Sequence, residues 1–482
     1  KELRKGFTNA KASDSKIDML TLERSGALGR SFLRWLGGIH LAPGQVVAVA
    51  GSILILIGAL LLMLPVSTPA GVEITFLDAL FTATSAVCVT GLIVLDTPHD
   101  FTIFGQIVIL TLIQVGGLGY ALMATVVLLI LGHRIGLRDR MMVSETLSTF
   151  DLQGSIRFVK MVALITLSFE GIGAIFLILR FATEMELGQA VYFGIFHAVS
   201  AFNNAGFALF SNNLASYQSD ISINGIVTVL VIFGSIGFLV FEDLIDNIKG
   251  RRFRLQTHTK LVLITTGILI AIGTLGIAWL EWANPRTFQS LNFGERLMTS
   301  YFQTVSRTSG FSTMDLSSMR DATLYFLLLL MAIGGSPGSM AGGVKTTTAA
   351  IVMLTIWTIL RRKPDVQVFH RRIPQDLIIR ALCLSIMALT MITFVTLLLA
   401  YTEERPFLGL MFEVTSAMGI VGLSLGDGGG RSFSALLTDF GKVMIIFSML
   451  LGRFGPLMIG LFALRTPARA TYRYPQARVV IG

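Results

Sequence analysis

Apolar runs long enough to cross a lipid bilayer recur along the whole chain and are separated by short polar segments. The runs fall into pairs, in which a first run is followed, after an interruption, by a second. The first runs are residues 45–64, 158–181, 259–280 and 377–400, and the second runs are residues 102–131, 224–245, 322–360 and 436–464. A helix needs about 20 apolar residues to span the hydrocarbon core. The pattern therefore predicts an all-α polytopic membrane protein with eight spanning helices.

Composition and charge agree with this class and predict an orientation. Of the 482 residues, 53% are hydrophobic and only 14% are charged, whereas a soluble domain carries about 25% charged residues. The net charge of +9 is concentrated in five basic clusters, at residues 1–34, 134–160, 249–260, 361–380 and 465–478. By the positive-inside rule these clusters and both termini are cytoplasmic, in a multi-pass protein of the cell (inner) membrane. Nucleic-acid binding is not expected, because no soluble basic domain is evident in the sequence.

A shorter and more polar segment lies between the two runs of each pair. Each such segment contains a Ser or Thr, then five residues, then a Gly followed by Leu or Phe. The instances are Ser85, Gly91 and Leu92; Ser200, Gly206 and Phe207; Thr304, Gly310 and Phe311; and Ser416, Gly422 and Leu423. Recurrence of one pattern in the same slot, at an interval of about 110 residues, indicates an internal repeat.

The repeats divide the chain into four units flanked by basic tails. We assign residues 1–44 to a cytoplasmic N-terminal tail, 45–135 to repeat 1, 136–250 to repeat 2, 251–365 to repeat 3, 366–470 to repeat 4 and 471–482 to a C-terminal tail. Each repeat is expected to contain a spanning helix, a re-entrant pore helix with its returning loop, and a second spanning helix, an order written M1–pore loop–M2. Four such repeats predict four pore helices around one pseudo-fourfold pore.

The short segments have the properties of pore loops. About ten apolar residues cannot cross the bilayer, and non-helical backbone at membrane depth is tolerated where it lines a water-filled cavity. Glycine accepts a positive φ readily, which lets carbonyl groups turn toward an axis and replace the hydration shell of K⁺. The expected potassium-filter residues are Val89, Thr90, Gly91, Asn204, Ala205, Gly206, Thr308, Ser309, Gly310, Ile420, Val421 and Gly422. The alternative, that the glycines are helix-packing positions, does not explain the Ser or Thr six residues earlier.

The second run of repeat 3 is interrupted in its middle by the sequence MAIGGSPGSMAGGVKTTT, residues 331–348. Residues 322–333 would cover about 18 Å as a helix, so the break falls near the middle of the bilayer. Unpaired backbone groups are costly there unless they face a water-filled path. We therefore interpret residues 334–343 as a movable gate below the filter. The expected gate residues are Gly334, Gly335, Ser336, Pro337, Gly338, Ser339, Gly342, Gly343, Lys345 and Arg453.

Two basic residues belong to this gate hypothesis. Arg453 lies within the last apolar run, where a charge is costly and marks a functional candidate. Its donors are expected to hold carbonyl groups of residues 334–343, and the alternative is an ion pair with an acidic residue on a neighbouring helix. Lys345 either adds positive potential to the closed gate or only extends its ammonium group toward water.

Three further ionisable residues lie in apolar surroundings. Arg307 is part of the third pore segment and is expected to pair with a carboxylate on a neighbouring pore helix, with Asp78 and Glu413 as candidates. The sequence predicts no role for Glu170. His197 is expected to be a satisfied packing residue of its pore helix.

The four pore segments together resemble those of the Trk/Ktr/HKT superfamily of potassium transporters. The matching stretches are VTGL, SAFNNAGF, RTSGF and VGLS, and the resemblance extends over about residues 40–482. It implies four M1–pore loop–M2 repeats in one chain, assembly as a homodimer, and a cytosolic nucleotide-binding regulatory ring of the KtrA type. It also implies an intramembrane gating loop in the second helix of repeat 3. Sodium dependence is a trait of Ktr relatives, while Gly91 favours potassium because some plant relatives that admit sodium have Ser at this position.

These observations predict the potassium-translocating subunit of a gated, channel-like uptake system. The alternative is a secondary transporter, such as a symporter coupling K⁺ to Na⁺ or protons, which requires an acidic site near broken helices; the break in repeat 3 contains no carboxylate. An enzyme is not expected, because the GGSPG sequence at residues 334–338 lacks the strand–turn–helix context of a nucleophile elbow. The GGVKTT sequence lacks the spacing of a Walker A loop, so no organic cofactor is expected in this chain.

Overall fold

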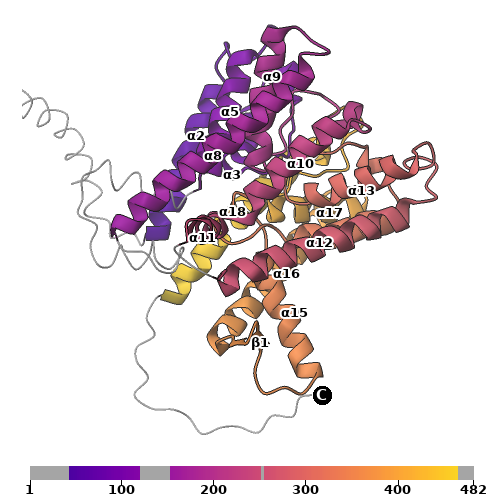
Figure 1. The fold of residues 1–482 in the computed structure, drawn as a ribbon. Helices are drawn as coiled ribbons and strands as arrows, with labels where there is room; N and C mark the ends of the chain where they lie inside the picture. Colours follow the sequence, from indigo (N-terminus) through magenta and orange to yellow (C-terminus); the bar gives the residue numbers. More distant parts are fainter. Residues whose placement is uncertain (1–42, 120–151, 251–253, 465–482) are drawn as a thin grey trace, which may run out of the picture.

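The computed structural model describes residues 43–119, 152–250 and 254–464, and it is almost entirely helical over these ranges (Figure 1). Within them, the strands are β1 (Gln367–Val368) and β2 (Arg371–Arg372), a short antiparallel pair. The all-α class predicted from the sequence is therefore confirmed for the described residues. The two basic tails, the basic cluster at 134–160 and the end of the run at 102–131 lie mostly or wholly outside them.

Each repeat contributes a first helix, a short helix and a second helix. The first helices are α2 (Pro43–Leu62), α8 (Leu152–Phe181), α12 (Thr257–Glu281) and α16 (Gln375–Thr402). The short helices are α3 (Phe76–Cys88), α9 (Leu187–Phe202), α13 (Phe293–Ser306) and α17 (Phe407–Gly419). The second helices are α5 (Ile103–Gly117), α10 (Ile221–Ile236) with α11 (Phe238–Ile248), α14 (Asp321–Ala332) with α15 (Thr346–Leu360), and α18 (Asp439–Leu464). One-turn elements α4 (Thr97–Asp100), η1 (Ala215–Tyr217), η2 (Leu316–Ser318) and η3 (Phe433–Leu436) lie between the short and second helices.

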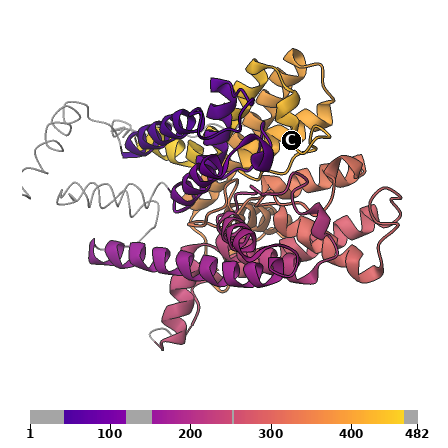
Figure 2. The same ribbon diagram turned by 90° about the horizontal axis from the view of Figure 1, so that it is seen from above.

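Helices of neighbouring repeats pack in an order that closes on itself. Within each repeat the short helix packs against the first helix, in the pairs α2–α3, α8–α9, α12–α13 and α16–α17. Each short helix also packs against the second helix of the preceding repeat, in the pairs α9–α5, α13–α10 and α17–α14, and α3 packs against α18. Figure 2 shows the result, since the indigo N-terminal helices lie beside the yellow C-terminal helices. The four units therefore form a ring.

The outward surface of the ring is apolar. In the described part of the chain, the helices long and apolar enough to cross a membrane are Val159–Phe181 in α8, Thr257–Glu281 and Gln375–Thr402. The bent pair α10 and α11 is a fourth candidate, and the other apolar helices are shorter. On α8, Leu164 and Leu167 are exposed by 68% and 65%, and a surface of this kind suits contact with lipid. The count of eight spans stays a prediction.

Buried carboxylates join the first and second helices of repeats 3 and 4. Glu281, at the end of α12, accepts hydrogen bonds from the Arg320 amide (2.9 Å) and the Thr323 hydroxyl at the start of α14. Glu403, just after α16, accepts hydrogen bonds from the amide (3.1 Å) and the hydroxyl of Thr438 at the start of α18. Buried carboxylates of this kind need such donors. The same arrangement at the same place in two repeats agrees with the sequence repeat.

The second helix of repeat 2 differs from the expected continuous run over residues 224–245. α10 and α11 are bent by 92° at a break. The bend occurs at Gly237, whose φ of +98° is a conformation that side chains disfavour. Here the Phe238 amide donates a hydrogen bond of 3.0 Å to the carbonyl oxygen of Gly338, which belongs to repeat 3. The glycines of the sequence FGSIGF indicate this break. The apolar pattern continues across it, however, and predicts an unbroken helix.

Candidate functional site

Four glycines meet where the short helices end. Gly91, Gly206, Gly310 and Gly422 all have φ values between +70° and +93°. A Cβ atom added to each would lie closer than 3.0 Å to a carbonyl oxygen of the next repeat: that of Ala205 for Gly91, Ser309 for Gly206, Val421 for Gly310 and Thr90 for Gly422. These contacts run from repeat 1 through repeat 4 and back to repeat 1, so the four segments form a closed ring. Backbone conformation and space both require glycine here.

The residues that precede the glycines are buried beside this ring. They are Val89, Thr90, Asn204, Ala205, Thr308, Ser309, Ile420 and Val421. Val89, Asn204 and Ile420 adopt a left-handed conformation, with φ of 60°, 60° and 55°. The hydroxyl of Thr308 donates to the side-chain oxygen of Asn204 at 3.1 Å, which links the second and third segments. The structure thus brings together all of the residues predicted for the filter.

The Ser or Thr six residues before each glycine holds the returning segment in three of the repeats. The hydroxyl oxygens of Ser85 and Ser416 each accept a hydrogen bond of 3.0 Å from the amide of Gly91 and Gly422, respectively. In repeat 2, the hydroxyl of Ser200 donates at 2.7 Å to the carbonyl oxygen of Phe207, the residue after the glycine.

Repeat 3 departs from this use of the hydroxyl group. Its Thr304 donates at 2.7 Å to the carbonyl oxygen of Ser300 within its own helix. The shared sequence position therefore has a physical reason in repeats 1, 2 and 4. In repeat 3 the same position contributes to packing, since the Thr304 side chain fills the space above Gly273 of α12.

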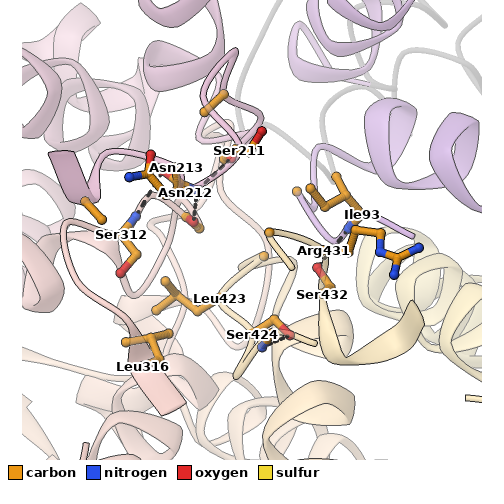
Figure 3. A pocket seen from close by; sticks show the side chains of 18 of the residues that line it. Ile93, Ser211, Asn212, Asn213, Ser312, Leu316, Leu423, Ser424, Arg431 and Ser432 are labelled. Carbon is orange, nitrogen blue, oxygen red and sulfur yellow. Dashed lines mark hydrogen bonds between the residues drawn. The ribbon is translucent and has the colours of Figure 1, made fainter. Parts of the chain in front are cut away.

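The glycine ring opens on one side into a cavity of about 440 Å³ (Figure 3). Polar side chains line it together with the four glycines: Ser211, Asn212, Asn213, Ser312, Ser424, Arg431 and Ser432. The side-chain amide of Asn213 lies 3.5 Å from the carbonyl oxygen of Gly206 and 3.4 Å from that of Gly310. Apolar side chains, among them Phe210, Met314 and Leu316, complete the lining, and the cavity leads directly to the ring.

The rim of this cavity contains an ordered acidic turn. Asp427 accepts hydrogen bonds from the amides of Gly429 (2.8 Å) and Arg431 (3.0 Å), and from the Arg431 guanidinium (2.7 Å). Partial burial acts to raise the pKa of Asp427, but these hydrogen bonds and the Arg431 charge outweigh it and hold the pKa below its ordinary value. The carboxylate is therefore the favoured form at the cavity mouth.

Residues 334–343 separate α14 from α15, so the predicted helix break is confirmed. The amide of Gly334 donates to the carbonyl oxygen of Val344 at 2.8 Å, and the amide of Gly335 donates to that of Gly342 at 3.2 Å. We call residues 333–335 and 342–344 the neck of the loop, and residues 336–341 its tip. A Cβ atom at Gly342 would collide with the side chain of Ile420. The neck therefore lies against the base of the fourth pore segment.

The tip of the loop is docked on the break between α10 and α11. The amides of Ser336 and Met340 donate to the carbonyl oxygens of Ser235 (2.9 Å) and Gly234 (3.1 Å). The carbonyl oxygen of Pro337 occupies the place that a side chain at Gly237 would need. Two broken helices, from repeats 2 and 3, thus satisfy each other's free backbone groups, as buried backbone requires.

Two basic side chains bind carbonyl groups of the tip. The Arg453 guanidinium donates to the carbonyl oxygens of Met340 (2.8 Å) and Gly116 (2.7 Å), which confirms the expected contact with the loop. The Lys345 ammonium group donates to the carbonyl oxygen of Ala341 at 2.8 Å. Lys345 therefore turns toward the loop instead of extending toward water.

The prediction that Arg307 pairs with a carboxylate is wrong. Asp78 is paired with Lys442 at 2.7 Å, and Glu413 accepts hydrogen bonds from Ser424 and Ser434. Arg307 is buried, with 4% of its surface exposed, and its guanidinium donates to two carbonyl oxygens at the end of α14. These belong to Ile333 and, at 3.3 Å, to Gly334. A helix that ends inside a protein leaves carbonyl groups without partners, and one guanidinium nitrogen, Nη1, donates to both of these.

Two polar residues without an assigned role also find partners. Glu170 of α8 accepts hydrogen bonds from the side-chain amides of Gln114 (3.0 Å) and Asn203 (2.9 Å), so it joins α5 to the residue at the end of α9. His197 is hydrogen-bonded to the Phe193 carbonyl oxygen (2.7 Å) and accepts from the Leu209 amide (3.3 Å). The packing role expected for His197 agrees with these contacts. No periodic signal marks the Glu170 contacts, because its partners lie in two other elements.

The chain is similar in sequence and in fold to known potassium uptake proteins. The Ktr system potassium uptake protein B of Bacillus subtilis is 42% identical over 451 residues, covering 93% of this chain and 98% of that protein. The potassium/sodium uptake protein NtpJ of Enterococcus hirae is 35% identical over 92% of this chain and 98% of its own length. The crystal structure of the potassium transporter TrkH from Vibrio parahaemolyticus has the same fold, with a TM-score of 0.68 and 21% identity over 89% of this chain and 86% of that one. The family described as TrkH, cation transport protein, matches residues 42–472, and the chain belongs to this family.

Proposed function

We propose that this chain is the potassium-translocating subunit of a gated, channel-like uptake system. The observation on which the proposal rests is the closed ring of four glycines, each in contact with a carbonyl group of the next repeat. A ring of carbonyl oxygens can replace the hydration shell of K⁺ without any ionised side chain. The short helices end at this ring, and a helix C-terminus carries roughly half a negative charge that attracts a cation.

The gate in this proposal is the loop at residues 334–343. Its neck contacts Ile420 at the base of the fourth filter segment, so the loop would lie in the path of an ion that leaves the ring away from the cavity. Its tip is held by side chains and by the α10–α11 break. All of these contacts are single hydrogen bonds, which a small displacement can exchange for water. The loop is therefore suited to open without unfolding the helices around it.

We infer the membrane orientation of the chain from its charge pattern and its partners from its relatives. Four repeats would cross the cell (inner) membrane eight times, with both termini and the basic clusters in the cytoplasm. The Bacillus subtilis relative carries the name of a Ktr system protein. We propose that this chain likewise acts as a homodimer with a cytosolic nucleotide-binding ring of the KtrA type, which would move the gate.

A coupled transporter is the second candidate function, because two observations from the structure favour it. Repeat 2 contains a second broken helix, and a buried carboxylate, Glu170, lies beside the second filter segment. Broken helices and intramembrane carboxylates are typical of ion-coupled sites. The Enterococcus hirae relative is named for both potassium and sodium. The experiment therefore also has to show whether Na⁺ activates transport or is coupled to it.

Rubidium influx into proteoliposomes tests the proposal. The purified chain is reconstituted with internal K⁺, and ⁸⁶Rb⁺ uptake is followed with and without external Na⁺. A channel-like subunit accumulates ⁸⁶Rb⁺ down its gradient in the absence of Na⁺, and excess K⁺ competes far better than excess Na⁺. Uptake that stops completely without a Na⁺ or proton gradient, while the protein is folded, would favour the coupled transporter.

A further inference from the structure

We propose that Arg307 anchors the neck of the gating loop to the third filter segment, and that it is a positioning residue for ion selectivity. The inference rests on the proposed function, because it assigns filter and gate to the same ion path. It differs from the role of Arg453, since the two arginines hold different parts of the loop. Arg307 acts on the neck, whereas Arg453 acts on the tip.

Arg307 connects two elements that must keep their distance during gating. Its backbone ends α13 and leads directly into Thr308, the first residue of the third filter segment. Its guanidinium donates to the carbonyl oxygens of Ile333 and Gly334, at the start of the neck. Thr308 in turn donates to Asn204 of the second filter segment. A displacement of the neck is therefore transmitted through one side chain to two of the four filter segments.

The neck is built as a fixed element. The Gly334 amide donates to Val344 and the Gly335 amide to Gly342, so the two sides of the neck are bonded to each other. A Cβ atom at Gly334 would lie closer than 3.0 Å to the Gly342 carbonyl oxygen. The two sides are thus in contact along their backbones. Arg307 adds the bond that fixes this closed unit to the filter.

The tip is held by basic side chains from two other places in the chain. Arg453 comes from repeat 4, and Lys345 reaches back to the tip from the start of α15. These contacts can be released while the neck stays bonded to Arg307. The geometry therefore divides the loop into a moving tip and a stationary neck. Opening then changes the passage below the ring and leaves the ring itself in place.

The arrangement uses the shape of an arginine and not only its charge. One nitrogen of the rigid, planar guanidinium, Nη1, donates to two successive carbonyl groups, while a lysine offers a compact ammonium group on a flexible stem. No carboxylate of the described residues forms an ion pair with Arg307. The replacement Arg307→Lys keeps the charge and loses the rigid, planar guanidinium that places Nη1 between the two carbonyl groups. The replacement Arg307→Gln loses the charge and keeps an amide donor.

The test measures ⁸⁶Rb⁺ influx and the concentration of Na⁺ that halves it, with the full chain in proteoliposomes. Arg307→Lys and Arg307→Gln are both expected to lower that Na⁺ concentration by about tenfold, the scale expected when a charged hydrogen bond is lost. Ser339→Ala removes a hydroxyl that bonds only within the tip. It is the matched control, and it is expected to change the rate of influx without changing competition by Na⁺.

Gly334→Ala gives a second route that leaves Arg307 intact. Its Cβ atom would force the two sides of the neck apart, so it is expected to reproduce the selectivity loss of the Arg307 variants. This variant decides the question where the Arg307 variants do not fold. Unchanged Na⁺ competition in the folded variants would overturn the inference. A normal Arg307→Lys with a defective Arg307→Gln would also overturn it, because charge alone would then suffice.

The control on the wild-type chain separates this inference from the proposed function. Wild-type protein must take up ⁸⁶Rb⁺ and prefer it to Na⁺ in the same assay. If it does not, the proposed function fails. If it does, and the neck variants keep its selectivity, only the role of Arg307 fails.

Discussion

The carbonyl oxygen of Met340 accepts a hydrogen bond of 2.8 Å from the guanidinium of Arg453, which also donates one of 2.7 Å to Gly116. Met340 belongs to the loop tip in repeat 3, Arg453 to α18 in repeat 4 and Gly116 to α5 in repeat 1. One side chain therefore holds three repeats together where the proposed gate closes. Its removal should free the tip without touching the glycine ring.

Arg453→Ala is expected to raise ⁸⁶Rb⁺ influx with little change in selectivity. A hydrogen bond to a charged group contributes about 1.5–3 kcal/mol, so the gain in influx should be about tenfold or more. Deletion of residues 336–341 should act in the same direction, and the double variant should not exceed the larger single effect, because both remove one contact. Arg180→Ala is the control, since Arg180 pairs with Glu184 and Asp220 away from the loop. A folded deletion variant with lower influx would show that the loop is part of the conducting path.

Gly91→Ser is expected to degrade the preference for K⁺ over Na⁺. Its Cβ atom would lie closer than 3.0 Å to the Ala205 carbonyl oxygen, so the ring must distort. Gly71→Ser is a matched control, because Gly71 has the same kind of backbone (φ +92°) with nothing within 4 Å of an added Cβ. Na⁺ competition against ⁸⁶Rb⁺ influx measures both. Equal selectivity in the two variants would remove Gly91 from the filter.

Ser416→Ala and Ser85→Ala should each weaken selectivity by a few-fold. Each hydroxyl oxygen accepts the amide hydrogen of a ring glycine, and an unsatisfied buried amide costs about 1–3 kcal/mol. Thr304→Val is the comparison, because the Thr304 hydroxyl bonds to Ser300 within its helix and not to the ring. The same Na⁺ competition assay applies. A larger effect at Thr304 than at the two serines would contradict this account of the repeated sequence position.

Thiol labelling at the two ends of α16 tests the membrane orientation of the chain. Glu404 follows this helix and Arg371 precedes it, and both side chains are exposed. Single cysteines at these positions, in a background without Cys88 and Cys383, are labelled in intact cells with a membrane-impermeant thiol reagent. Labelling is expected at position 404 and not at position 371. The opposite result would invert the topology and place the cavity on the cytoplasmic side.

The acidic turn at the cavity mouth should be insensitive to moderate acid. The pKa of Asp427 is lowered in the folded protein, so its stabilising contribution is present above the ordinary Asp pKa of about 3.9 and is lost only as pH falls through the lower folded value. Asp427→Asn should therefore reduce ⁸⁶Rb⁺ influx by the same factor at an external pH of about 7.5 and about 5. Wild-type influx that falls to the level of the variant at the lower pH would show that the carboxylate titrates in this range.

The parts of the structure that sequence reasoning found are those with local causes. The need for glycine at positions 91, 206, 310 and 422 leaves a mark in each repeat, because a positive φ at a crowded point admits little else. The break before α15 was equally visible, since residues 334–343 interrupt an apolar run with glycines and a proline. Such features can be read from one segment at a time.

The parts that it missed depend on contacts between distant segments. Arg307 was expected to pair with Asp78 or Glu413, because a buried charge suggests an opposite charge. Its partners are instead carbonyl groups freed by the end of α14, which no sequence pattern identifies. The bend at Gly237 likewise exists where the loop tip of repeat 3 supplies a hydrogen bond to Phe238. The eight spans and their orientation remain predictions.

The reversal potential of a variant without the gate shows whether K⁺ passes a carbonyl ring below which residues 334–343 form the gate. The variant lacking residues 336–341 is reconstituted in planar bilayers with a K⁺ gradient and, separately, with an opposing Na⁺ gradient of equal size. We expect a current whose reversal potential follows the K⁺ gradient and shifts little when the Na⁺ gradient is imposed. A reversal potential that follows Na⁺, or that depends on a fixed ratio of the two ions, would contradict it.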